Sequence, residues 1–274
     1  MSESNRIVLG DSRDIKNYPE GIALTITSPP YYCEKDYESD YSFQDYKDLL
    51  RSVLRNVASK TLPGGKICIN IADIAAFSKV SGKVEEYIGI SRDIQDWMRE
   101  EDCFLLARTI WHKDEPWVNS QHVSYHEKIP ATYVRQLPNW EYVWTYYKTT
   151  PAREGVGSIT NYLSKAEWRK LVSAVWEIRS VQANDDHPAK FPEELVRNLV
   201  RLYSVPGDLV FDPFMGSGTT AVVAYKNRRE FAGIERDPHF HELTHKNLEK
   251  VANSLEREFI PEEKFKQNSL EFPK

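Results

Sequence analysis

The chain has 274 residues, of which 41% are hydrophobic and 28% are charged, and its formal net charge is −5. This length suits one large globular domain, or one domain that carries a small recognition insert. The acidic net charge excludes a protein that coats nucleic acid through bulk positive charge, although basic groups gathered on one face would still allow DNA binding.

Strand-like apolar runs alternate with amphipathic helices along the chain, which predicts an α/β sheet. We predict short strands over 7–10 and 23–27, the second of which ends before a Pro-Pro pair. Apolar residues at three- and four-residue spacing predict a helix over 43–58 with Ser42 as its N-cap. A Pro-Gly-Gly turn then leads to a third strand over 66–71.

The second half of the chain continues the alternation after a helix over 91–100 and a strand over 104–111. Residues 142–147 are rich in β-formers, and we expect them to pair with that strand as an antiparallel edge strand. The stretches 112–140 and 149–186 are irregular, apart from a short helix over 165–176. The remaining predicted elements are helices over 192–204, over 217–227 and from Asp237 onward, strands over 208–211 and 230–234, and a charged tail after Pro261.

Two segments combine chemically useful residues with positions at strand ends. Thr27-Ser-Pro-Pro-Tyr-Tyr32 directly follows a predicted strand, and Phe211-Asp-Pro-Phe-Met-Gly-Ser-Gly-Thr-Thr220 joins a strand to a helix. Ligands of open α/β sheets bind at the carboxyl ends of the strands. We therefore expect both segments to contribute to one site.

The glycine segment favours a cationic nucleoside as its ligand. Gly216 and Gly218 allow a tight turn and a close approach of the backbone, although such a pair also occurs in ordinary strand-to-helix turns. No Walker lysine follows, which disfavours a triphosphate. Glu235 ends the next strand, close to the roughly 20-residue spacing of an acid that binds ribose hydroxyls. Asp212 would repel a pyrophosphate but would tolerate a sulfonium group.

The segment around Ser28 suits a flat base that carries an amino group. The Ser28 hydroxyl can accept a hydrogen bond from the amine, and the prolines fix the backbone so that a carbonyl points into the site. Tyr31 offers a stacking face, worth roughly 1–3 kcal/mol per base. The alternative is a Pro-Pro turn whose aromatic residues cap the core.

Both segments, in this order, resemble the motifs of the amino-group DNA methyltransferases, in particular the permuted class in which the catalytic motif precedes the cofactor motif. His187-Pro-Ala-Lys-Phe-Pro192 resembles the cofactor-flanking motif of that family. The resemblance covers about residues 7–250, except 112–186. It implies a Rossmann-like methyltransferase fold, with a mainly parallel sheet, an antiparallel edge strand and a small, loop-rich target-recognition region.

The resemblance also implies S-adenosylmethionine as the methyl donor and S-adenosylhomocysteine as the product. Glu235 would hold the ribose hydroxyls, Asp11 would meet the adenine amino group, and Lys190 would reach the methionine carboxylate. Ser28, Pro29, Pro30 and Tyr31 form the implied catalytic set. The implied cofactor-binding set is Asp11, Lys190, Phe191, Pro192, Asp212, Phe214, Gly216, Gly218, Thr219, Thr220 and Glu235.

The reaction that this set suggests is methylation of a base flipped out of duplex DNA. Hydrogen bonds accepted by Ser28 and by the Pro29 carbonyl would localise the lone pair of the amine. Members of the family with serine before Pro-Pro-Tyr usually methylate N4 of cytosine, whereas those with Asp or Asn usually methylate N6 of adenine. We expect a site-specific cytosine-N4 enzyme, the modification part of a restriction-modification system. Adenine-N6 methylation, an RNA substrate and an inactive nucleic-acid-binding regulator stay open as alternatives.

Other chemistries are disfavoured by the sequence. Cys33 follows Tyr32 rather than a proline, unlike the nucleophile of the ring-carbon cytosine methyltransferases. His112, His122 and His126 are interpreted as loop residues, and we expect no metal.

The three cysteines include no CxxC pair, the chain shows no apolar run of roughly 20 residues, and its first residues lack a secretory signal. We therefore expect a cytoplasmic protein with no membrane contact.

We expect double-stranded DNA to contact residues 112–186, unless the charges there form only a solvated surface. A cognate restriction endonuclease is a further possible partner, and monomer and homodimer stay open. The expected regions are a catalytic half (1–111), the recognition insert (112–186, interrupted by an edge strand at about 141–148), a cofactor-binding half (187–260) and a tail (261–274). The candidate DNA contacts are Arg135, Lys148, Arg153, Lys165, Arg169, Lys170 and Arg179.

Overall fold

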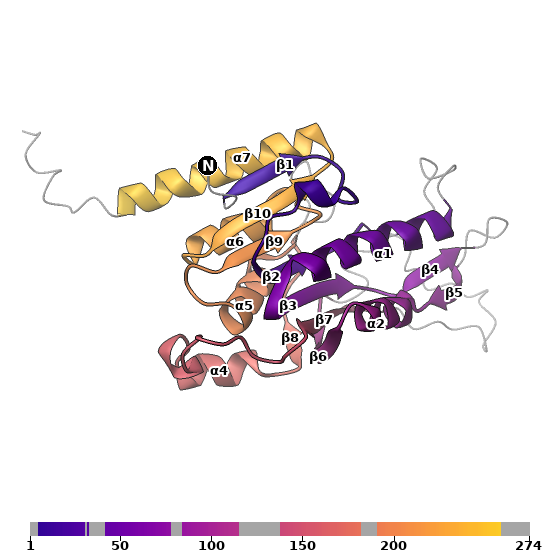
Figure 1. Ribbon diagram of the computed structural model, residues 1–274, viewed down its shortest axis with the longest axis horizontal. Coiled ribbons are helices and arrows are strands. Elements are labelled where there is room, and N and C mark those ends of the chain that lie inside the picture. The colour runs from indigo at the N-terminus through magenta and orange to yellow at the C-terminus, as the bar shows by residue number, and fades with distance from the viewer. Residues whose placement is uncertain are drawn as a thin grey trace, which may run out of the picture.

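A computed structural model describes residues 5–30, 32, 42–77, 84–114, 138–181 and 191–258 of the chain. Within these ranges an eight-stranded sheet carries helices on both faces, and a separate two-stranded hairpin projects beside it (Figure 1). The hairpin consists of β4 (Ile74–Phe77) and β5 (Val84–Ile88). The strands of the sheet are β1 (Arg6–Leu9), β2 (Ile22–Thr27), β3 (Thr61–Ile71), β6 (Cys103–His112), β7 (Trp140–Lys148), β8 (Val175–Glu177), β9 (Leu209–Asp212) and β10 (Glu230–Glu235).

The order of the strands across the sheet is β1-β10-β9-β2-β3-β7-β6-β8. The first five strands in this order are parallel, β7 is antiparallel to both of its neighbours, and β8 is parallel to β6. The predicted, mainly parallel α/β sheet is therefore confirmed. The antiparallel strand expected at the edge lies inside the sheet instead, because β6 and the short β8 continue the sheet beyond it.

The two ends of the parallel strands define two edges of the sheet. Thr27 of β2, Asp212 of β9 and Glu235 of β10 end at one edge, called here the carboxyl edge. The opposite edge, where these strands begin, is called the amino edge. Because β7 runs the other way, Trp140 lies at the carboxyl edge and Lys148 at the amino edge.

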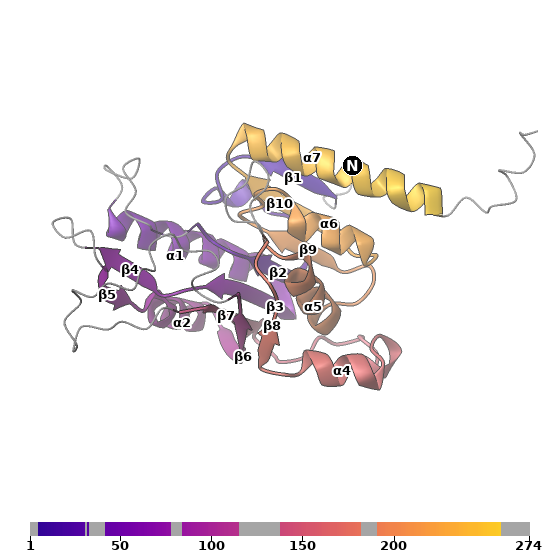
Figure 2. The same cartoon turned by 180° about the vertical axis from the view of Figure 1, so that it is seen from behind.

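Helices cover both faces of the sheet. On each face, the helices and the sheet enclose a separate hydrophobic core. α1 (Phe43–Lys60) and α2 (Ile90–Glu100) lie in front of the sheet in Figure 1, and α5 (Glu193–Tyr203) and α6 (Thr219–Lys226) come to the front in Figure 2. Within the described ranges, none of the helices combines the length and apolar character that a bilayer-crossing segment requires. The remaining elements are α4 (Lys165–Leu171), α7 (Pro238–Glu258) and the short 3-10 turns η1 (Ile15–Asn17) and η3 (Ile159–Asn161).

α1 begins where the sequence predicts it. The Ser42 hydroxyl accepts a hydrogen bond from the Asp45 amide at 3.1 Å, and the Asp45 carboxylate accepts one from the Ser42 amide at 2.9 Å. A cap of this kind contributes about 1 kcal/mol. Tyr46, Leu50 and Val53 then face the core, where each apolar side chain contributes roughly 1.5–3 kcal/mol on burial.

Two other elements differ from the sequence-based prediction. The helix expected over 165–176 ends at Leu171, because Val175 pairs with Ile110 and begins β8. The β4–β5 hairpin, which joins β3 to α2, was not predicted. β8 belongs to the main sheet, although its residues fall in the stretch expected to form the recognition region, whereas β7 is the strand that was expected to interrupt that stretch.

Candidate active site

A cavity of about 300 Å³ opens at the carboxyl edge of the sheet. It lies where β9 and β2 are neighbours, and the chain continues from these two strands to opposite sides of the sheet, towards β10 and towards β3. Such a change of direction leaves a crevice in which open α/β sheets bind ligands. The lining residues include Ser12, Ser28, Pro29, Pro30, Phe191, Asp212, Phe214, Gly216, Thr219, Thr220, Glu235, Arg236 and Phe240.

The loop from β9 to α6 needs glycine at two positions that the sequence singled out. Gly216 has φ 54° and Gly218 has φ 85°, and both values lie in the left-handed region that side chains disfavour. A Cβ atom at Gly218 would also lie 2.6 Å from the Thr244 side chain. The two glycines therefore let the loop turn tightly between the strand and the cavity.

Glu235 is held in place by backbone amides. One carboxylate oxygen accepts a hydrogen bond from the Gly216 amide at 2.7 Å, and the other accepts one from the Asp237 amide at 2.8 Å. The residue is only 8% exposed and lines the cavity. Each oxygen keeps a second lone pair. A fixed carboxylate of this kind can accept hydrogen bonds from the two hydroxyls of a ribose.

Asp212 is a buried carboxylate surrounded by uncharged donors. Its two oxygens accept hydrogen bonds from the Phe214 amide at 3.0 Å and from the Thr220 hydroxyl at 2.9 Å. Burial raises the pKa of Asp212 to about 6, although both hydrogen bonds act in the opposite direction. A cationic ligand in the cavity would stabilise the ionised form, so this residue fits the positively charged sulfonium of S-adenosylmethionine.

The rest of the lining also fits an aromatic nucleoside with a methionine tail. Phe191, Phe214 and Phe240 are partly buried and offer ring faces to the cavity. Thr219 begins α6, and the free amides of a helix N-terminus attract a carboxylate. Acidic groups, ring faces and a helix N-terminus therefore occur together, as this cofactor requires.

The catalytic candidates line the same cavity as the cofactor candidates. Ser28 is half-buried at the end of β2, followed by Pro29, which is buried, and Pro30, which is exposed. Among the described residues no partner bonds to the Ser28 hydroxyl. Tyr31, the fourth member of the expected catalytic set, lies outside the described residues.

Some expected cofactor residues take other positions. The Asp11 carboxylate is half exposed, does not line the cavity and pairs with Arg13 at 2.6 Å. The hydrogen bond from Arg13 lowers the pKa of Asp11. Pro192, which follows Phe191 in the chain, is buried at the start of α5, and Gly218 directly precedes Thr219. Lys190 lies outside the described residues.

Besides Ile234 of β10, three lining residues lie outside the segments that the sequence singled out. Ser12 follows the end of β1, Arg236 follows the end of β10, and Phe240 lies in the first turn of α7. All three lie in segments that follow parallel strands. The position after a strand end is the only sequence signal that would have indicated them.

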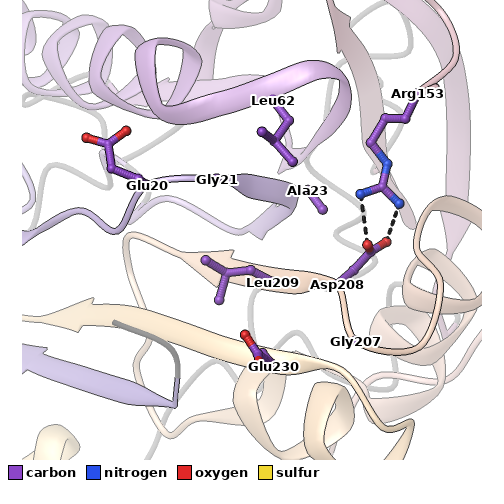
Figure 3. Close-up of a pocket in the computed structure, with 9 residues that line it drawn as sticks. All are labelled: Glu20, Gly21, Ala23, Leu62, Arg153, Gly207, Asp208, Leu209 and Glu230. Atoms are coloured by element: carbon purple, nitrogen blue, oxygen red, sulfur yellow. Dashed lines mark hydrogen bonds and ion pairs between the residues drawn. The ribbon is translucent and has the colours of Figure 1, made fainter. Parts of the chain in front are cut away.

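A second cavity, of about 360 Å³, opens at the amino edge and contains one expected DNA contact (Figure 3). Arg153 donates two hydrogen bonds to the Asp208 carboxylate, at 2.8 and 2.5 Å, and their side chains are only 15% and 11% exposed. Lys148 lies at the same edge, where its amine donates to the Glu101 carbonyl at 2.5 Å. Both cationic side chains are thus hydrogen-bonded at the amino edge, at the opposite end of the strands from Ser28.

The remaining DNA candidates among the described residues are exposed. Arg179 follows β8 and therefore lies at the carboxyl edge. Lys165, Arg169 and Lys170 lie on α4, which packs beside α5. Arg135 lies outside the described residues, as do Cys33, His122 and His126. His112 is described, and one of its ring nitrogens lies 2.9 Å from the Asn139 amide nitrogen.

Comparisons with known proteins agree with this geometry. The DNA methylase family model matches residues 22–246. The type II methyltransferase M.BglI of Bacillus subtilis is 31% identical over 91% of this chain and 87% of its own length. M.MjaI of Methanocaldococcus jannaschii, also a type II methyltransferase, is 29% identical over 86% of this chain and 88% of its own length.

Solved structures show the same fold. A proposed DNA modification methylase from Thermus thermophilus, complexed with S-adenosyl-L-methionine, superposes with a TM-score of 0.71 at 28% identity over 90% of this chain and 93% of that one. The PvuII DNA methyltransferase, described as cytosine-N4-specific, gives 0.66 at 23% identity over 92% and 91% of the two chains, and shows likeness of fold alone. The chain belongs to the N6/N4 DNA methylase family, the S-adenosylmethionine-dependent methyltransferases that modify amino groups of DNA bases.

Proposed function

We propose that this chain methylates the exocyclic N4 atom of cytosine in duplex DNA. The observation that carries the proposal is that Ser28, Pro29 and Pro30 line the same cavity as Asp212 and Glu235. The acceptors for a target amine thus lie beside the groups that suit the cofactor. The type II names of M.BglI and M.MjaI support a further part of the proposal, that the chain is the modification enzyme of a restriction-modification system.

The residues on the cofactor side of the cavity orient the methyl donor. When bound, S-adenosylmethionine supplies a methyl group that its sulfonium sulfur already activates towards nucleophiles. Glu235 accepts hydrogen bonds from the ribose hydroxyls through its second lone pairs, and Asp212 faces the positive end of the cofactor. Alignment of the methyl group with the incoming nitrogen then supplies a large part of the acceleration.

The catalytic side must make a weak nucleophile react. The target base has to leave the duplex, at a cost of a few kcal/mol, and Tyr31 is proposed to stack on it. Its amino lone pair is delocalised into the ring. Hydrogen bonds accepted by the Ser28 hydroxyl and the Pro29 carbonyl draw the two amine hydrogens aside, which moves the nitrogen towards tetrahedral geometry and localises the lone pair.

Cytosine is favoured over adenine because the residue before the Pro-Pro pair is a serine. In the family that the sequence resembles, serine there usually accompanies cytosine, whereas Asp or Asn usually accompanies adenine. A serine hydroxyl is shorter and accepts less strongly than a carboxylate or an amide. It therefore suits an amine that is held nearer the backbone.

The test is to methylate mixed-sequence DNA, digest it to nucleosides and identify the product by mass spectrometry. We expect N4-methylcytosine. N6-methyladenine would overturn the choice of base and leave the mechanism standing, whereas 5-methylcytosine would overturn both. The absence of any methylated nucleoside would favour a nucleic-acid-binding regulator with the same fold.

We also propose that DNA approaches the carboxyl edge and contacts residues from the stretch 112–186. Arg179 is the described candidate best placed for this. The exposed residues Lys165, Arg169 and Lys170 of α4, beside α5, stay in the proposed set. Arg135 stays in the proposed set. Lys148 and Arg153 are left out because both are engaged at the amino edge.

A further inference from the structure

Asn70 of β3 lies beside the proposed catalytic serine. β2 and β3 are parallel, and Thr27, the last residue of β2, pairs with Ile69. Ser28 and Asn70 each directly follow a member of this pair, and adjacent strands are about 4.8 Å apart. Ile26 and its partner Cys68 both pack in the core beneath α5 and α6. Because side chains alternate along a strand, Asn70 falls on the same face as Cys68, and Ser28 follows β2 two residues after Ile26.

Asn70 also lies on the side of Ser28 that faces away from the cofactor groups. The strand order β9-β2-β3 places Asp212 on one side of Ser28 and Asn70 on the other. A target base that contacts Ser28 while the cofactor lies on the β9 side therefore approaches the β3 side of Ser28. Asn70 is 2% exposed, so its polar atoms require partners within the protein.

The amide of Asn70 is held in one orientation. Its nitrogen donates to the Glu141 carboxylate at 2.8 Å and to the Tyr142 carbonyl at 3.0 Å, which uses both of its hydrogens. Glu141 is 7% exposed, and its other oxygen pairs with Lys113. A flipped amide would turn the Asn70 oxygen towards this carboxylate, which is unfavourable. The side-chain oxygen Oδ1 of Asn70 is thus fixed as an acceptor, and no donor among the described residues bonds to it.

The proposed role of Ser28 creates a need for such an acceptor. A serine hydroxyl both donates and accepts. If its hydrogen pointed at the target amine, it would bind the lone pair that has to attack the methyl group. The hydrogen must therefore be directed elsewhere while the serine oxygen accepts from the amine.

The structure shows no hydrogen bond between Ser28 and Asn70; we propose that it forms when the target base is bound, with Asn70 Oδ1 accepting the hydroxyl hydrogen of Ser28, and that Glu141 keeps the amide turned for this purpose. Asn70 and Glu141 are then positioning residues, which act on the amine through Ser28. This inference rests on the proposed role of Ser28 in the methyl transfer. It predicts that what matters at these two positions is a hydrogen bond between them that leaves an oxygen at position 70 free to accept from Ser28, rather than the identity of either residue.

The experiment measures the single-turnover rate of methyl transfer to DNA, with cofactor and DNA affinities measured in parallel. Glu141→Gln replaces a charged acceptor by an amide that can also donate, so Asn70 can flip. We expect the rate to fall roughly tenfold or more while both affinities stay unchanged. Glu177→Gln is the matched control, since Glu177 is exposed on β8 at the same edge, and its rate should stay within about twofold of wild type.

A swap of donor and acceptor gives the sharper test. Asn70→Asp alone places a second carboxylate against Glu141 and should also slow the reaction by roughly tenfold or more. In the double variant Asn70→Asp/Glu141→Gln, the new amide on β7 donates to one oxygen of the new carboxylate on β3. The other oxygen of that carboxylate is then left to accept from Ser28. Asn70→Asp and the double variant both place a carboxylate oxygen against the Tyr142 carbonyl, so the double variant should be faster than Asn70→Asp alone.

The possible results separate the two proposals. A Glu141→Gln rate equal to wild type, or a folded double variant no faster than Asn70→Asp alone, would overturn the role of Asn70. If the double variant does not fold, the Glu141→Gln rate at unchanged affinities decides alone. Ser28→Ala, measured in the same assay, tests the proposed function itself, because a wild-type rate there would remove the serine from the mechanism and the inference with it.

Discussion

Two cavities of similar size open at opposite edges of the same sheet, about 300 Å³ at the carboxyl edge and about 360 Å³ at the amino edge. At the amino edge Arg153 pairs with Asp208 and Lys60 pairs with Glu20. At the carboxyl edge Asp212 and Glu235 accept only from amides and a hydroxyl. Volume therefore does not identify the site. The cavity lined by these two buried carboxylates, which have no cationic partner among the described residues, is the one that suits a cationic cofactor.

The largest expected effect tests the amino edge as a structural region. Arg153→Ala leaves the Asp208 carboxylate without its guanidinium partner in a mostly buried position. We expect unfolding in denaturant to show a loss of about 3 kcal/mol, while the affinity for S-adenosylmethionine is unchanged. The double variant Arg153→Ala/Asp208→Ala should recover part of the loss. A weakened cofactor affinity in a folded Arg153→Ala protein would show that the two edges are not independent.

The second prediction compares the two ends of one strand. Glu235→Ala removes a carboxylate proposed to accept hydrogen bonds from both ribose hydroxyls, so cofactor binding should weaken by roughly tenfold or more in calorimetry. Glu230→Ala is the matched control, because Glu230 begins β10 and lines the amino-edge cavity. Its affinity should match wild type. If a folded Glu235→Ala variant binds as tightly as wild type, Glu235 does not belong to the site.

The third prediction concerns pH. Burial raises the pKa of Asp212 from 3.8 to about 6, so the carboxylate becomes protonated as the pH falls through that value. A cationic ligand prefers the ionised form, and the affinity should fall about fourfold between about pH 7.5 and about pH 5.5. Asp212→Asn should remove this dependence. In the free protein the same shift lowers stability as the pH rises from about 4 to about 6, because the folded state holds the proton more tightly than the unfolded state.

The smallest effect concerns DNA. Arg179→Ala should reduce the slope of DNA affinity against salt concentration by about one unit, since one fewer phosphate contact releases fewer counterions. Arg153→Ala should leave the slope unchanged, at a temperature where the variant is folded. The reverse result would place the DNA at the amino edge.

Local signals in the sequence predicted much of the fold. α1 was predicted because Ser42 caps it and its apolar residues repeat at helical spacing. β6 and β7 were predicted as an antiparallel pair from their β-forming residues. β8 was missed because it has only three residues, and its pairing with β6 depends on a distant part of the chain. That missed strand is also the reason why β7 was expected at the edge.

A site residue was predictable only where its type and its place at a strand end together indicated its position in the fold. Ser28, Asp212 and Glu235 lie at the ends of parallel strands, so sequence order alone brought them to one edge. A basic residue carries no such information. The direction of β7 sends Lys148 to the amino edge, and the Asp208 pair keeps Arg153 there. Asn70 lies inside a predicted apolar strand, where nothing in the sequence shows that it neighbours Ser28.

Methyl transfer to DNA from radiolabelled S-adenosylmethionine, catalysed by Ser28→Ala, tests most directly the claim that the carboxyl edge performs the chemistry. Loss of the hydroxyl removes one acceptor for the target amine and leaves the cofactor groups untouched. We predict a single-turnover rate roughly 10²- to 10³-fold below that of wild type, with cofactor affinity unchanged. A Ser28→Ala protein that methylates DNA at the wild-type rate would contradict the account.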